Sequence, residues 1–100
     1  MENRVAVISV IVRKGADVAV LNDLLHQSAP YIVGRMGIPY QQRGVSIICV
    51  AVDAPADRIS ALSGKLGRLS GVTAKTVYAP EEALSDSAEA DNNQSGGMLQ

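Results

Sequence analysis

The chain has 100 residues, of which 47% are hydrophobic and only 3% aromatic, with no Phe, no Trp and a formal net charge of −1 at pH 7. This length suits one domain with an aliphatic core, and the near absence of aromatic side chains argues against the stacking platforms of single-strand nucleic-acid binders. A near-neutral charge argues against a general phosphate-backbone binder, and a single cysteine excludes an internal disulfide.

The charge is unevenly distributed along the chain. Residues 1–80 hold nine basic and five acidic residues, a net charge of +4, whereas residues 81–100 hold five acidic and no basic residues. Low hydrophobicity and charge of one sign predict that residues 81–100 form a disordered acidic tail after a domain of residues 1–80. Such a tail either stays solvated or masks a basic surface of the domain.

The first predicted elements are a strand and a helix. Val5 to Val12 is apolar and rich in β-branched residues, which predicts a buried strand. Gly15 breaks that strand, and Asp17 is a suitable capping residue for a helix that ends at or before Ala29, since Pro30 follows. The aliphatic stripe of this helix consists of Val18, Leu21, Leu24 and Leu25.

Two further strands are predicted in the middle of the chain. Tyr31 to Ile38 is a strand candidate that contains two glycines, and Pro39 to Gly44 is predicted to be a turn. Val45 to Val52 is strongly apolar and predicts a third strand.

The last predicted elements are a helix and a strand. Asp53 to Pro55 is typical of a helix start, and Gly71 is a typical helix stop before a strand from Val72 to Tyr78. The stripe of this second helix consists of Ile59, Leu62, Leu66 and Leu69. The order β-α-β-β-α-β predicts an α+β, ferredoxin-like sandwich, with a four-stranded antiparallel sheet of order 4-1-3-2 and two helices on one face.

Both faces of the two central strands are apolar, although two helices can cover only one face. An uncovered apolar face of this size favours association, so we predict a homodimer or tetramer. The alternatives are a monomer with an apolar surface, or a tail that folds over the sheet. The predicted interface residues are Val5, Val7, Ile11, Val45, Ile47, Cys49 and Ala51.

No residue set typical of catalysis is present, so the sequence predicts no enzyme, no cofactor and no metal site. His26 is the only histidine and suits a solvated position near a helix C-terminus. Cys49 lies among aliphatic residues and is expected to behave as a small hydrophobic side chain. The opening apolar run is too short to span a bilayer and has no cleavage signal, which predicts a cytoplasmic protein without membrane contact.

Two glycine-containing segments admit a structural and a functional interpretation. Gly15 is either a simple turn residue or part of a helix N-terminus that binds an anion. Gly64 and Gly67, in a segment without a P-loop signature, either allow close packing or line a small-ligand pocket, with Lys65 or Arg68 near an anion.

Six segments of the chain match the pattern of a known family in order and spacing. They are RVAVISVIV, LNDLLHQ, YIVGRMGIPY, VDAP, ISALSGKLGRLSGV and KTVYA. Together they resemble the iron-only hydrogenase system regulators, which are ACT-like domains, and the resemblance covers residues 4–79. It implies an ACT-like fold, similar also to the C-terminal domain of nickel-responsive regulators, and a homo-oligomer with a regulatory or sensing role linked to hydrogenase assembly.

The resemblance also implies a ligand site. ACT domains often bind amino acids or similar small ligands at a subunit interface, near the turn after the first strand. Carried over, this implies a site formed by Gly15, Ala16, Asp17 and Val18. Arg13 and Lys14 stand where the ACT motif tends to have Asp and Pro, which argues against an amino-acid ligand. The metal site of nickel regulators uses several histidines and does not carry over, and no ribbon-helix-helix DNA-binding element is present.

The favoured function is therefore a small oligomeric regulatory module that binds a small-molecule effector or a protein partner in a hydrogenase-related system. One alternative is an adaptor subunit that binds a maturation protein without any ligand. Another is a DNA-associated transcriptional regulator that uses the basic domain, for which DNA contact is expected to need a partner.

Overall fold

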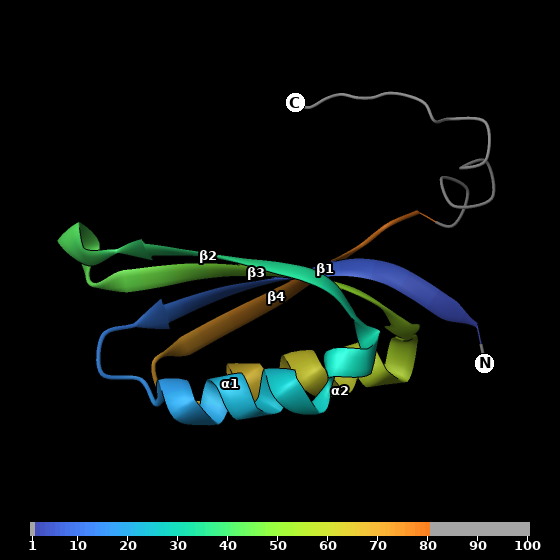
Figure 1. The fold of residues 1–100 in the computed structure, drawn as a ribbon, viewed down its shortest axis with the longest axis horizontal. Helices are drawn as coiled ribbons and strands as arrows, with labels where there is room; N and C mark the ends of the chain where they lie inside the picture. Colours follow the sequence, from blue (N-terminus) through green and yellow to red (C-terminus); the bar gives the residue numbers. More distant parts are fainter. Residues whose placement is uncertain (1, 81–100) are drawn as a thin grey trace.

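A four-stranded sheet and two helices form a two-layer sandwich (Figure 1). The computed structural model describes residues 2–80, so the predicted tail at residues 81–100 lies outside the described residues. The elements are β1 (Asn3–Arg13), α1 (Val18–Gln27), the 3-10 turn η1 (Ala29–Tyr31), β2 (Ile32–Tyr40), the 3-10 turn η2 (Gln41–Arg43), β3 (Val45–Pro55), α2 (Ala56–Gly67) and β4 (Val72–Tyr78).

The strand order is β2-β3-β1-β4, and each pair of neighbours is antiparallel. Read in reverse, this is the predicted order 4-1-3-2, so the ferredoxin-like prediction is confirmed. Both helices lie on one side of the sheet, and the other side carries no element of the described chain (Figure 1). The long central ladder pairs Asn3 with Pro55 at one end and Arg13 with Val45 at the other.

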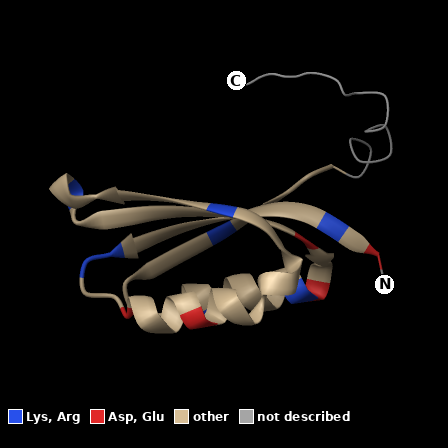
Figure 2. Cartoon of the chain, in the orientation of Figure 1, with Lys and Arg blue, Asp and Glu red and all other residues tan. Residues whose placement is uncertain are grey.

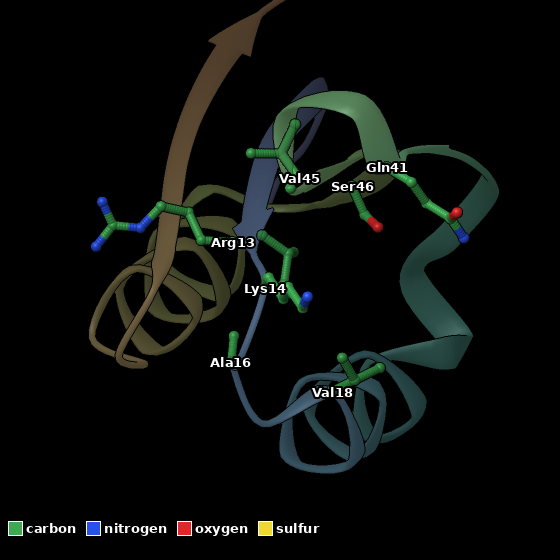
Figure 3. Close-up of a pocket in the computed structure, with 10 residues that line it drawn as sticks. Arg13, Lys14, Ala16, Val18, Gln41, Val45 and Ser46 are labelled. Carbon is green, nitrogen blue, oxygen red and sulfur yellow. The ribbon is translucent and has the colours of Figure 1, made fainter.

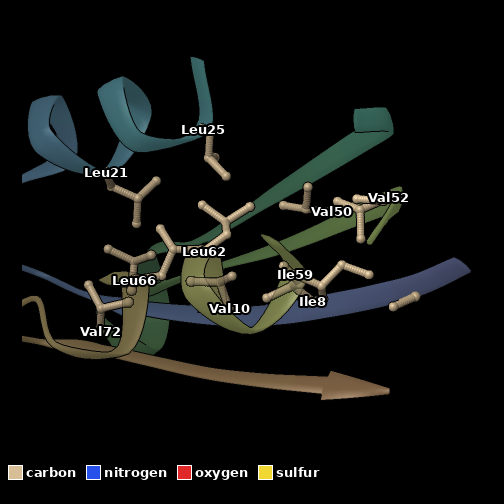
Figure 4. Close-up of a cluster of buried hydrophobic side chains, with 13 residues drawn as sticks. Ile8, Val10, Leu21, Leu25, Val50, Val52, Ile59, Leu62, Leu66 and Val72 are labelled. Atoms are coloured by element: carbon tan, nitrogen blue, oxygen red, sulfur yellow. The ribbon is translucent and has the colours of Figure 1, made fainter. Parts of the chain in front are cut away.

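The core lies between the helices and the sheet and consists only of aliphatic side chains (Figure 4). Alternate residues of β1 and β3 point into it, as the period of two in a strand requires. Each fully buried Val, Leu or Ile side chain stabilises the fold by about 1.5–3 kcal/mol. The buried residues are Ala6, Ile8, Val10, Val12, Leu21, Leu25, Val50, Val52, Ala54, Ile59, Leu62, Leu66 and Val72.

The predicted boundaries of β2 and β3 are wrong by a few residues. β2 begins at Ile32 and continues through Pro39, which an edge strand tolerates because its outer N–H positions need no partner. β3 continues to Pro55, and Asp53 pairs with Val5 instead of opening a helix. The reason is that β1 starts at Asn3 and supplies partners for these residues, so Pro55 is the last residue of β3 and directly precedes α2.

The helix stripes are confirmed except at their ends. Leu21 and Leu25 of α1 are buried, but Val18 is 53% exposed because it lies in the first turn, beyond the edge of the core. In α2, Ile59, Leu62 and Leu66 are buried, as predicted. Leu69 packs on the core from the segment after the helix. Within the described residues, neither helix is both long and apolar enough to cross a membrane.

Candidate functional site

A cavity of about 540 Å³ opens where β1 turns toward α1, facing the end of the β2–β3 hairpin (Figure 3). One wall comes from the end of β1 and the turn after it, and the other from η2 and the start of β3. The lining residues are Val12, Arg13, Lys14, Gly15, Ala16, Val18, Gln41, Gly44, Val45 and Ser46.

The turn between β1 and α1 is held in place by backbone hydrogen bonds to both neighbouring loops. The Arg13 amide donates to the Gly71 carbonyl oxygen and the Lys14 amide to the Gly44 carbonyl oxygen, each at 2.8 Å. Gly15 has a φ of 95°, a conformation that favours glycine, and the Ala16 amide closes the turn onto the Arg13 carbonyl oxygen at 3.1 Å. The cavity wall is therefore fixed by the fold.

Asp17 caps α1. Its Oδ1 accepts a hydrogen bond of 3.2 Å from the Val20 amide, which satisfies one of the free N–H groups of the first helical turn. Asp17 is not among the residues that line the cavity. Its carboxylate thus belongs to the helix.

The side chains around the cavity carry positive charge and hydrogen-bonding groups but no carboxylate. The Lys14 ammonium and the Ser46 hydroxyl point toward the middle of the cavity above Val18, whereas the Arg13 guanidinium extends to the other side of β1 (Figure 3). Basic residues also gather at this end of the sheet, at the end of β1 and in η2, which contains Arg43 (Figure 2). Lys14 and Ser46, which line the cavity, can attract and hold a small anion.

The structure brings together three of the four residues at which the sequence predicts a ligand. Gly15, Ala16 and Val18 line the cavity, and Asp17 does not. The opposite wall, formed by Gln41, Gly44 and Ser46, is missing from the prediction. No local pattern marks these three residues, because only the pairing of β1 with β3 brings them to the turn.

The sheet face without helices, which we call the open face, carries mostly apolar side chains, interrupted by Ser9 of β1 and by Thr73 and Lys75 of β4. All seven predicted interface residues lie on this face. Here Val7 of β1 lies opposite Ala51 of β3, Ser9 opposite Cys49, and Ile11 opposite Ile47. Exposed side chains of the outer strands extend the apolar surface on both sides. These are Met36, Ile38 and Tyr40 of β2, opposite Cys49, Ile47 and Val45, and Val77 of β4, opposite Val7.

The comparisons with known proteins place the chain in a family. The model of the TM1266-like family, described as an iron-only hydrogenase system regulator, matches residues 4–76. The chain belongs to the TM1266-like family. The solved structure of the uncharacterized protein TM1266 from Thermotoga maritima is 35% identical, with a TM-score of 0.76, and the match covers 79% of this chain and 100% of that one. A search of curated proteins found no match.

The second predicted site of this TM1266-like chain lies on α2, away from the cavity. Gly64 is half-buried, whereas Lys65, Gly67 and Arg68 are exposed. No atom lies within 4 Å of a Cβ placed on Gly67, so the close-packing interpretation is wrong there. Lys65 borders a hollow of about 80 Å³ between the helices, together with Tyr31 and Arg58.

The remaining titratable candidates of this TM1266-like chain lie apart from one another. His26 is exposed beside the groove between α1 and β2, where Arg35 Nη2 donates to Asn22 Oδ1 at 3.1 Å. Cys49 is half-buried and has a free thiol in the middle of the open face. Among residues 2–80, no three His, Cys, Asp or Glu side chains gather as a metal site would require.

Proposed function

We propose that this chain is a regulatory module of an iron-only hydrogenase system, which works as a homo-oligomer and responds to a small ligand bound in the cavity at the β1–α1 turn. The observation that carries the proposal is this cavity, since it lies at the turn that the family resemblance implies and backbone hydrogen bonds hold that turn against both neighbouring loops. A volume of about 540 Å³ is typical of pockets for small molecules. The family description supplies the system.

The open face supports self-association. Val7, Ile11 and Val77 expose 40%, 45% and 65% of their side chains to solvent, and Met36 exposes 57%. A mostly apolar exposed surface of this kind on a small domain favours a protein partner. A second copy is the simplest one, because a two-fold axis lets the same surface cover itself.

The charges at the two ends of the open face favour one orientation of the two copies. Asp53 lies at one end, opposite Val5, and Arg13 at the other end, opposite Val45. If the central strands of the two copies run antiparallel across the interface, each Asp53 meets the other copy's Arg13. The parallel arrangement would instead bring like charges together, which costs free energy.

A second candidate function is an adaptor, in which the open face binds a different protein and the cavity has no ligand. The same exposed apolar side chains favour this reading, because they need a cover of some kind. The two functions differ in the mass of the purified protein and in its response to small molecules.

Two measurements on the full chain test the proposal. Sedimentation at several concentrations is expected to give a dimer or a larger form, and a small-molecule screen by thermal unfolding is expected to give at least one stabilising compound. A ligand at one hundred times its Kd adds about 2.7 kcal/mol to the free energy of unfolding. A monomer at every concentration, with no stabilising compound, would favour the adaptor.

A further inference from the structure

We infer, building on the proposed function, that the cavity at the β1–α1 turn takes a small aliphatic carboxylate, and that the Lys14 ammonium is its anchor. The inference names the class of ligand for that site. It stands on the charges of the lining residues, on the direction of their side chains and on the existing hydrogen bonds of the turn.

The polar side of the cavity suits an anion. Lys14 and Ser46 point toward its middle, and Gln41 adds an amide on the hairpin wall (Figure 3). No lining residue carries a negative charge. An ammonium that donates to a carboxylate makes a charge-assisted hydrogen bond, which is about twice as strong as a neutral one.

The start of α1 is partly taken up by contacts within the chain. The Val20 amide donates to Asp17 Oδ1, and the Ala16 amide donates to the Arg13 carbonyl oxygen. The Asp17 carboxylate also neutralises the positive end of the helix dipole. Lys14 is the lining cation that points into the cavity, so we assign the charge of a ligand to this side chain.

The apolar side of the cavity favours a ligand with an alkyl group. Val12 belongs to the buried core and lines the cavity, and Val18 faces the cavity from α1 (Figure 3). Val18 is 53% exposed in the free chain, although it is a β-branched side chain on a helix whose buried face is otherwise Leu. A short branched alkyl group would cover Val18 and remove this apolar surface from water.

The test is a titration of the ¹⁵N-labelled full chain, followed by amide chemical shifts, with three probes. They are 3-methylbutanoate, its neutral counterpart 3-methylbutanamide, and inorganic phosphate, which is charged but has no apolar body. We expect 3-methylbutanoate to shift the amides of Lys14, Val18 and Ser46 in a saturable way at millimolar concentration. The other two probes are expected to bind about tenfold more weakly or not at all.

A matched pair of variants assigns the effect to Lys14. Lys14→Gln is expected to weaken the binding of 3-methylbutanoate by about tenfold, as the loss of a charge-assisted hydrogen bond implies. Arg43→Gln removes the same charge from the same end of the sheet, at a residue that does not line the cavity, and is expected to leave the binding unchanged.

Three results would overturn the inference. Equal affinities for the carboxylate and its amide would show a cavity that binds ligands without recognising charge, and would leave the proposed function standing. Equal losses of affinity for 3-methylbutanoate in Lys14→Gln and Arg43→Gln would show that only the general positive potential at this end of the sheet attracts the ligand. No shift at the cavity with any probe would reject the aliphatic carboxylate, while sedimentation and the wider screen test the proposed function separately.

Discussion

Ser9 lies directly opposite Cys49 in the middle of the β1–β3 ladder, on the open face. The larger Ile11 and Ile47 flank this pair of small side chains on one side, and Val7 and Ala51 flank it on the other. A slip of one residue in the register would turn Ser9 into the core and Val10 out of it, so the pattern also fixes the pairing. The open face is thus a defined surface whose centre and ends can be altered separately.

A charge placed on the open face should abolish self-association without unfolding the chain. We expect Ile11→Lys to give a monomer in sedimentation, because a lysine at this 45% exposed position stays solvated in the monomer but loses water in a dimer. Val20→Lys is the matched control, since Val20 is 42% exposed but lies on α1. An unchanged mass for Ile11→Lys would contradict the open-face interface.

Reversing the charges at the ends of the open face should reveal how the two copies are oriented. Asp53→Arg and Arg13→Asp are each expected to weaken the dimer by about 1–2 kcal/mol, counted over the two symmetric contacts. The double variant is expected to regain most of that loss, because the pairs form again with exchanged charges. The dissociation constants come from sedimentation, and losses that simply add in the double variant would reject the antiparallel arrangement.

Two glycines near the end of α2 should respond to alanine in opposite directions. Gly71→Ala is expected to lower the free energy of unfolding by about 1–2 kcal/mol, because Gly71 has a φ of 79°. Its added Cβ would also meet the Ala16 Cβ at 3.3 Å. In Gly67→Ala the added Cβ has no neighbour within 4 Å, and alanine has the higher helix propensity. This variant is expected to raise the free energy of unfolding by up to about 1 kcal/mol. Denaturant unfolding measures both, and a shared sign would contradict the assigned roles.

The Asp17 cap should affect stability more than ligand binding. Asp17→Ala is expected to cost about 0.5–2 kcal/mol in denaturant unfolding, because the Val20 amide loses its acceptor. Asp17→Asn keeps an acceptor oxygen and is expected to keep most of that free energy. Neither variant is expected to weaken the binding of 3-methylbutanoate, since Asp17 does not line the cavity. A loss of binding in a folded Asp17→Asn variant would place the ligand at the helix terminus.

The architecture is predictable from the sequence because alternation in strands and stripes in helices are local signals. The alternation in β1 separates Val5 from Ala6 onto opposite faces, and because both faces are apolar the sequence leaves open which one the helices cover. In the structure it is the face of Ala6. The ends of the elements are less predictable, since pairing decides them. Pro39 remains in β2 because that strand is at the edge of the sheet, and Asp53 remains in β3 because Val5 is available opposite.

The cavity is only half predictable. The turn residues Gly15 and Ala16 are marked by the strand-to-helix change in the sequence, and the family resemblance points to the same place. Ser46 and Gln41 carry no such mark, and they approach the turn only through the β1–β3 register and the hairpin. The direction of the Lys14 side chain, on which charge recognition depends, is likewise a property of the folded chain.

The amides of Arg13 and Lys14 donate hydrogen bonds to the carbonyl oxygens of Gly71 and Gly44, respectively. They tie the cavity wall to both sides of the sheet, the hairpin of β2 on one side and the start of β4 on the other. A site braced in this way is preorganised, so a ligand spends little of its binding free energy on ordering the chain. We therefore expect occupancy to be signalled by a change of surface charge at this end of the molecule, with the backbone nearly still.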